Sequence, residues 1–145
     1  MATTSPQNYS NHVRRDPPFH FFILPVLAVA FGLSVQAFVR NPGLASFWGI
    51  LFVVAVLILA LKSRMYANKV QDRVIRLEER LRLARLMPES QRAQIPKLTE
   101  DQLIALRFAS DEEAFALAER ALSQNLSRED IKKTIKNWRP DYWRV

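Results

Sequence analysis

The sequence predicts an all-α membrane protein: a two-helix transmembrane hairpin, a second helix extended into a cytoplasmic rod, and a small bundle of three short helices. Three observations predict this fold. Two uncharged apolar runs lie close together, a long stretch without a helix breaker follows them, and three helix-start signals come later. We expect five segments, namely a cytoplasmic tail (1–18), the hairpin (19–61), the rod (62–87), a linker (88–98) and a helical cytoplasmic domain with an aromatic tail (99–145).

The two apolar runs are 19–39 and 44–61, with 21 and 18 residues and no formal charge. A helix rises about 1.5 Å per residue, so each run approaches the ~30 Å thickness of the hydrocarbon core of a bilayer. Only Arg40-Asn41-Pro42-Gly43 separates them, which is a tight turn. The runs therefore predict a hairpin with both ends on one face of a membrane.

The basic residues predict the orientation of the hairpin. Cytoplasmic loops are enriched in Lys and Arg, and the turn carries only Arg40. Both termini are therefore expected in the cytoplasm. The flanking basic residues are also expected to contact anionic lipid head groups; they are Arg14, Arg15, Lys62, Arg64 and Lys69.

Several residues inside the runs predict helix contacts. Ala28 and Gly32 in the first run, and Ala45 and Gly49 in the second, are expected to let the two helices approach closely, or to pack on a partner subunit. Gln36 is expected to make an interhelical hydrogen bond.

Two further features belong to the first run alone. Pro25 is expected to kink the helix, because proline has no N–H to donate. Ala28-Val29-Ala30 resembles a signal-peptide cleavage site, so a cleaved signal peptide is the alternative interpretation. The apolar stretch continues past that site and a second run follows at once, which favours the hairpin.

The rod carries a heptad-like seam. Apolar residues recur in alternating steps of three and four, at Ala67, Val70, Val74, Leu77, Leu81 and Ala84. This spacing is typical of a coiled coil, although it covers only two heptads. Ile75, Leu83 and Leu86 form a second apolar strip. Two interpretations stay open: the rod pairs with another subunit, or it packs on the C-terminal part of its own chain.

Three capping motifs predict the short helices of the last segment. Thr99, Ser110 and Ser127 each precede acidic residues and an apolar run, as the first residue of a capping box does. About 40 residues are too few for a well-stabilised core without help. The domain is therefore expected to lean on the rod, on the membrane surface or on a partner.

The C-terminal tail is rich in aromatic and Arg side chains. Such residues dominate protein–protein hot spots, so they are candidates for partner binding, together with the seam. The candidates are Trp138, Arg139, Tyr142, Trp143 and Arg144 in the tail, and Val70, Val74, Leu77 and Leu81 in the seam. The alternative is that the aromatic side chains cover the helical core or lie at the membrane interface.

The composition argues against several classes of function. There is no Cys, and the two His residues are His12 and His20, which leaves little for a metal or cofactor site. We find no Gly-rich phosphate loop and no nucleophile–base pair, so we expect no enzyme and no small-molecule substrate. The chain is basic, with a net charge of +7, but Tyr66 is the only aromatic residue of its rod, whereas nucleic-acid binding needs a basic face interleaved with aromatic residues, so we expect no nucleic acid as a partner.

Segments at both ends resemble a known family. These are NYSNH at 8–12 and IKKTIKNWRPDY at 131–142, and the sequences at 98–103 and 106–113 are similar to the same family. They resemble a family of small bacterial two-span inner-membrane proteins of unknown function. The resemblance implies an inner-membrane location and supplies no catalytic residues.

The function that we expect is that of a non-catalytic accessory or scaffold subunit of a bacterial inner-membrane complex. Its partners would be integral-membrane subunits and anionic lipids. The alternative is a self-associating membrane organiser that pairs with itself through the Ala67–Ala84 seam.

Overall fold

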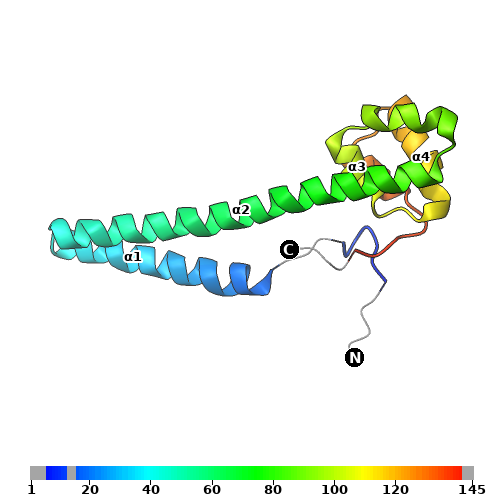
Figure 1. Cartoon of the computed structure of the whole chain (residues 1–145). Coiled ribbons are helices and arrows are strands. Elements are labelled where there is room, and N and C mark those ends of the chain that lie inside the picture. Colours follow the sequence, from blue (N-terminus) through cyan, green and yellow to red (C-terminus); the bar gives the residue numbers. More distant parts are fainter. Residues whose placement is uncertain (1–5, 13–15, 142–145) are drawn as a thin grey trace. The chain divides into compact units, whose positions relative to one another are not determined.

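The computed structural model describes residues 6–12 and 16–141, and in this part of the chain its regular elements are helices (Figure 1). They are the π-helix η1 (Pro18–Ile23), α1 (Leu24–Arg40), α2 (Leu44–Leu86), the 3-10 helix η2 (Glu89–Lys97), α3 (Glu100–Leu106), α4 (Asp111–Ser123) and α5 (Arg128–Thr134). The chain divides into two compact units. Of the described residues, 16–68 form the hairpin unit, and 6–12 together with 69–141 form the helical unit.

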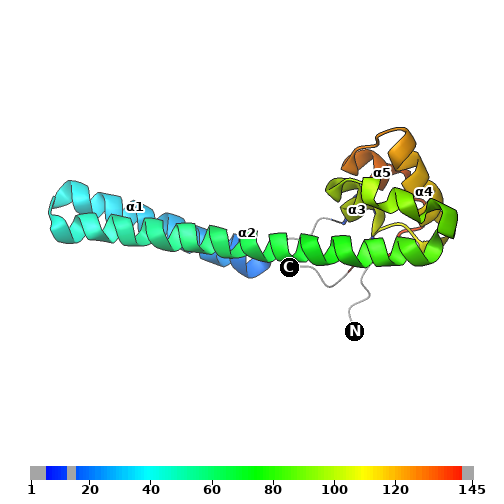
Figure 2. The ribbon, with the colours of Figure 1, turned by 45° about the horizontal axis from the view of Figure 1, so that its top comes forward.

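The hairpin unit contains two helices that are long and apolar enough to cross a membrane, as predicted. None of the residues in their most apolar windows is buried within the chain. α1 lies antiparallel beside the first part of α2 (Figures 1 and 2). Ser46 closes the turn, because its hydroxyl donates to the Asn41 carbonyl at 2.9 Å and accepts from the Gly43 N–H at 3.1 Å.

Packing within the hairpin uses fewer of the predicted residues than expected. Gly49 faces α1, since a Cβ on it would lie 4.0 Å from the Ser34 hydroxyl. The same expectation is wrong for Ala28 and Gly32, which are exposed, and a Cβ on Gly32 would meet nothing within 4 Å. Gln36 is also exposed, and among the described residues its side chain has no hydrogen-bond partner. The reason is that these residues lie on a side of α1 turned away from α2.

Pro25 coincides with a change of helical winding. The residues before it form η1, and α winding begins at Leu24, one residue earlier. Proline has no N–H to donate to the carbonyl four residues back. The structure thus has a wide π turn on the N-terminal side of Pro25, and the kink that we expected there stays a prediction.

The helical unit encloses one hydrophobic core. Its largest fully buried side chains come from α2, α3 and the segments that follow them; they are Leu83, Met87, Leu103, Leu106, Phe108 and Ile131. Figure 2 shows α3, α4 and α5 gathered together. The predicted linker belongs to this core, since it forms η2 and buries Ile95 and Leu98. The three short helices thus lean on the rod, which was one of the expected supports.

The predicted capping boxes are confirmed at Thr99, while Ser127 caps α5 by accepting from the Asp130 N–H at 3.2 Å. Gln102 completes the Thr99 box, and its side-chain amide also donates to the carbonyls of Ala121 and Leu126 at 3.0 and 3.2 Å. This ties the start of α3 to the end of α4.

The prediction is wrong at Ser110. This residue is the N-cap of α4, but its hydroxyl accepts no helix N–H. The acid that would complete the box, Glu113, instead accepts the backbone N–H groups of Lys136 and Asn137 at 3.2 and 3.0 Å. It therefore holds the C-terminal segment against α4.

Candidate interaction surface

The part of α2 that belongs to the helical unit, residues 69–86, has two contrasting faces. One face packs on α3 and the segments around it, through Ile75, Glu79 and Leu83, which are buried. Ile75 and Leu83 belong to the second apolar strip of the sequence. The chain therefore packs on its own C-terminal part mainly through this strip, and the heptad seam contributes only its end residue Ala84.

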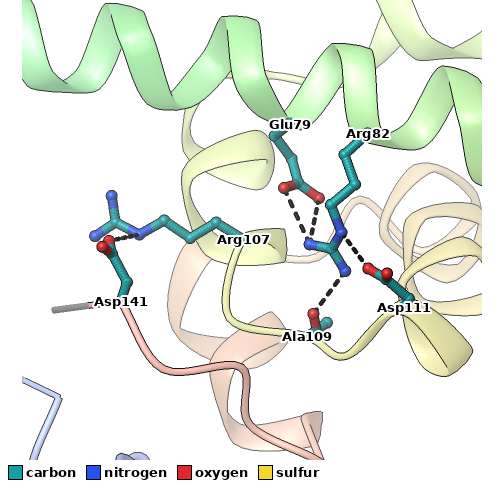
Figure 3. A network of polar contacts seen from close by, with 6 residues as sticks. All are labelled: Glu79, Arg82, Arg107, Ala109, Asp111 and Asp141. Carbon is teal, nitrogen blue, oxygen red and sulfur yellow. Dashed lines mark hydrogen bonds and ion pairs between the residues drawn. The ribbon is translucent and has the colours of Figure 1, made fainter. Parts of the chain in front are cut away.

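A polar network reinforces the packed face (Figure 3). The Arg82 guanidinium donates to both oxygens of the Glu79 carboxylate at 3.1 Å, to Asp111 at 2.7 Å and to the Ala109 carbonyl at 2.7 Å. Arg76, three residues before Glu79, pairs with Glu100. Glu79 is only 2 % exposed, so its charge depends on Arg82 for compensation.

Burial raises the pKa of the Glu79 carboxyl above the ordinary value of 4.5, and the Arg82 guanidinium partly offsets this. The folded state therefore binds this proton more tightly than the unfolded chain does. Protonated Glu79 therefore adds to the free energy of unfolding. This contribution is fully present below pH 4.5 and is lost as the pH rises through the raised pKa of Glu79 in the folded state.

We therefore expect a defined pH dependence for the Glu79→Gln variant. The free energy of unfolding of the wild type, relative to that of the variant, should fall as the pH is raised from 4.5 towards neutrality. Urea unfolding of the full-length chain in detergent, read by pulse proteolysis at several pH values, measures this difference. A difference that is constant or grows with pH would show that burial does not dominate at Glu79.

The four central residues of the heptad seam lie on the opposite face and are exposed, whereas Ala84 at its end is half-buried against the core. Val70, Val74, Leu77 and Leu81 have exposed fractions of 62%, 49%, 60% and 52%. At 3.6 residues per turn they form one stripe, about half a turn round the helix from Ile75, Glu79 and Leu83. Apolar stripes of this kind on otherwise polar helices mark interaction surfaces.

The N-terminal segment joins the helical unit through aromatic and cationic contacts. The His12 ring lies 5.8 Å from the Phe108 ring and 5.7 Å from the Trp138 ring, between centroids. The Lys132 ammonium lies 3.0 Å from His12 Nε2, so this nitrogen accepts, and Nδ1 donates to the Tyr9 carbonyl at 2.6 Å. The NYSNH segment thus packs against Phe108, Lys132 and Trp138 of the helical unit.

These observations can be compared with known proteins. The model of one family of unknown function, DUF6526, matches residues 1–145. The chain belongs to the DUF6526 family. No curated protein and no solved structure matches it significantly.

In this DUF6526 chain, the predicted tail residues have different environments. Trp138 is half-buried and its ring lies 5.1 Å from that of Phe108, so it covers the core. Arg139 is exposed at its side chain, while its N–H donates to the Phe108 carbonyl at 2.7 Å. Asp141 pairs with Arg107 at 3.4 Å (Figure 3). Tyr142, Trp143 and Arg144 lie outside the described residues.

The predicted lipid-facing residues also differ from one another. Lys62 and Lys69 are exposed, whereas Arg64 donates to the Asp16 carboxylate at 2.8 Å and lies 5.1 Å from the centre of the Phe19 ring. Arg64 therefore fastens α2 to the start of the π-helical turn. Arg14 and Arg15 are outside the described residues.

Sequence reasoning missed Asp16 and His12 as contact residues. Their partners, Arg64 and Lys132, are 48 and 120 positions away. The Glu79–Arg82 pair, in contrast, is predicted by its i,i+3 spacing and is present in the structure. Within the described ranges, no group of three or more His, Cys, Asp or Glu residues could hold a metal ion.

Proposed function

We propose that the protein is a non-catalytic accessory or scaffold subunit of a bacterial inner-membrane complex, anchored by its hairpin with both termini in the cytoplasm. The apolar side chains of α1 and of the first part of α2 support the anchoring, because they have no protein cover within the chain. In lipid, such helices satisfy their own backbone hydrogen bonds and bury their side chains in hydrocarbon.

The contacts of the N-terminal segment support the placement of both ends on one side. Gln7 accepts the Asp141 N–H at 2.8 Å, and His12 contacts Trp138. Gln7 and His12 precede the first apolar helix, and their partners follow the second. A chain that crosses the bilayer twice brings these segments together on one face, and the basic residues beside the hairpin favour the cytoplasmic face.

The observation that carries the proposal is the outward side of α1. Ala28, Gly32 and Gln36 are four residues apart, so they share one side of the helix, and all three are exposed. Small residues let a second helix approach closely, and an amide in hydrocarbon gains from a hydrogen bond across helices. A transmembrane helix of a partner subunit would satisfy Gln36 and cover Gly32.

Gentle extraction from the native membrane followed by native mass spectrometry tests this proposal. We expect distinct subunits to accompany the chain at fixed stoichiometry. Gly32→Leu adds bulk to the contact and should release them. Gln36→Leu removes the amide and should weaken the association by about 1–2 kcal/mol, which is roughly five- to thirtyfold.

Ala37→Leu is the matched control, because it adds the same kind of bulk at an exposed position on a different side of α1. It should leave the co-purifying subunits in place. The proposed function would be contradicted if the chain is extracted alone, or if the amount of co-purifying subunits is the same for the wild type, Gly32→Leu and Gln36→Leu.

A further inference from the structure

We propose that the exposed stripe of α2, which consists of Val70, Val74, Leu77 and Leu81, binds the same stripe of a second copy of this chain as a parallel two-stranded coiled coil. The inference rests on the membrane anchoring of the proposed function. It adds a partner at a face that the proposed contact through α1 does not use.

The residue types of the stripe match such a pair. In heptad terms, Val74 and Leu81 are a positions, and Val70 and Leu77 are d positions. A β-branched residue at a with Leu at d favours two parallel strands, and Val74 with Leu77 provides this combination at the centre of the stripe. Ala67 continues the pattern at one end, while Ala84, at the other end, is half-buried against the core.

The stripe is accessible without rearrangement of the helical unit. Its four side chains are about half exposed or more, while the opposite face of the same helix segment is buried by η2, α3 and the segments around them. A second helix can therefore approach the stripe while Glu79 and Leu83 stay in place.

The charges beside the stripe are complementary in a parallel pair. Arg73 is at position g and Glu78 at the following e, which are the positions that pair between the two helices. Both are exposed, and neither forms an ion pair among the described residues. In the pair, Arg73 of each copy meets Glu78 of the other, twice by symmetry.

The next g–e pair is repulsive, because it brings Arg80 of one copy to Arg85 of the other. The contact is thus short and of limited strength. Anchoring both copies in one membrane compensates for this by raising their effective concentration. It also aligns them in parallel, since both copies insert in the same orientation and α2 continues without interruption from the apolar span into the stripe.

Cysteine cross-linking in the native membrane tests the pairing and its direction, because the chain contains no Cys of its own. We expect Val70→Cys to give roughly tenfold more covalent dimer than Asn68→Cys, since a disulfide needs Cα atoms within about 7 Å. Asn68 is an exposed position on the same helix but off the stripe. In an antiparallel pair, Leu77→Cys would still cross-link at the centre of the stripe, and Val70→Cys would not.

Charge exchange identifies the partner as a second copy. In the Val70→Cys background, Arg73→Glu places like charges opposite each other and should lower the yield of dimer severalfold. The double exchange Arg73→Glu with Glu78→Arg restores opposite charges within a homodimer and should restore the yield. Arg80→Glu turns the repulsive pair into an attractive one and should raise the yield above that of Val70→Cys alone.

Equal yields from Val70→Cys and Asn68→Cys, cross-linking at Leu77→Cys only, or no rescue by the double exchange would each overturn the inference. Its failure is distinguishable from that of the proposed function. If distinct subunits still co-purify without a cross-linked dimer, the homodimer is wrong and the accessory role stands. If the cross-linked dimer forms but no other subunit co-purifies with the chain, the accessory role is wrong and the homodimer stands.

Discussion

Replacing Arg82 with Ala is expected to destabilise the helical unit by about 3–5 kcal/mol at neutral pH, because it leaves a buried carboxylate without its counter-charge. Arg82 makes two hydrogen bonds to Glu79 and one each to Asp111 and the Ala109 carbonyl. Hydrogen exchange of the α3–α5 amides, measured by mass spectrometry on the full-length chain in detergent, reports this unit alone. The expected loss corresponds to roughly 10²- to 10⁴-fold faster exchange.

Two comparisons make this result specific. Arg120→Ala removes an exposed Arg from α4 and should change the stability by about 0.5 kcal/mol or less. Adding Glu79→Gln to Arg82→Ala removes the uncompensated charge and should recover part of the loss. The cost of Arg82→Ala should also shrink at acidic pH, because burial raises the pKa of Glu79 and the carboxyl takes up a proton there. If Arg82→Ala exchanges no faster than Arg120→Ala, the network does not stabilise the unit.

Phe108→Ala is expected to have an effect of similar size. Phe108 is fully buried, the Trp138 ring packs against it, and the Arg107 guanidinium lies 4.5 Å from its centroid. Truncation of a buried Phe typically costs about 3–5 kcal/mol, because it removes apolar contacts and leaves a cavity. The same hydrogen-exchange measurement should show faster exchange of α3–α5.

A second readout in the same experiment concerns the N-terminal segment. His12 rests against Phe108 and Trp138, so the amides of residues 6–12 should lose protection along with the helices. Phe115→Ala is the control, because Phe115 is half-buried at the edge of the core and its loss should cost less. Equal effects from Phe108→Ala and Phe115→Ala, or unchanged exchange at residues 6–12 in Phe108→Ala, would argue against a core that residues 6–12 and the helices share.

Much of the helix content could be predicted from local pattern. The apolar runs, the tight turn and the Thr99 box each depend on residues within a few positions of one another, and the structure contains the corresponding helices. Ser110 shows the limit of this reasoning. Its box matches the pattern, but the completing acid, Glu113, is engaged by Lys136 and Asn137 from a distant part of the chain.

The candidate surface could be predicted only as a pair of alternatives. Both strips of the rod are apolar and both have helical spacing, so periodicity cannot distinguish them. The residue that distinguishes them is Glu79, because its carboxylate is buried with Arg82 beside Ile75 and Leu83. This fixes the second strip on the inside and leaves Val74 and Leu77 exposed. The Arg64–Asp16 and Lys132–His12 contacts were also beyond prediction, because they join residues far apart in the chain.

Local residue preferences therefore determined the two long apolar helices, the uninterrupted rod and three short helices, two of which have the predicted side-chain cap. They act through backbone hydrogen bonds, capping and the periodicity of apolar side chains, all of which operate over one or two turns. Only the tertiary structure decided which strip of the rod is covered, that the N-terminal segment belongs to the helical unit, and that Gln36 faces away from α2. These outcomes depend on contacts between residues distant in the chain, whose free energy is gained only when the whole unit packs together.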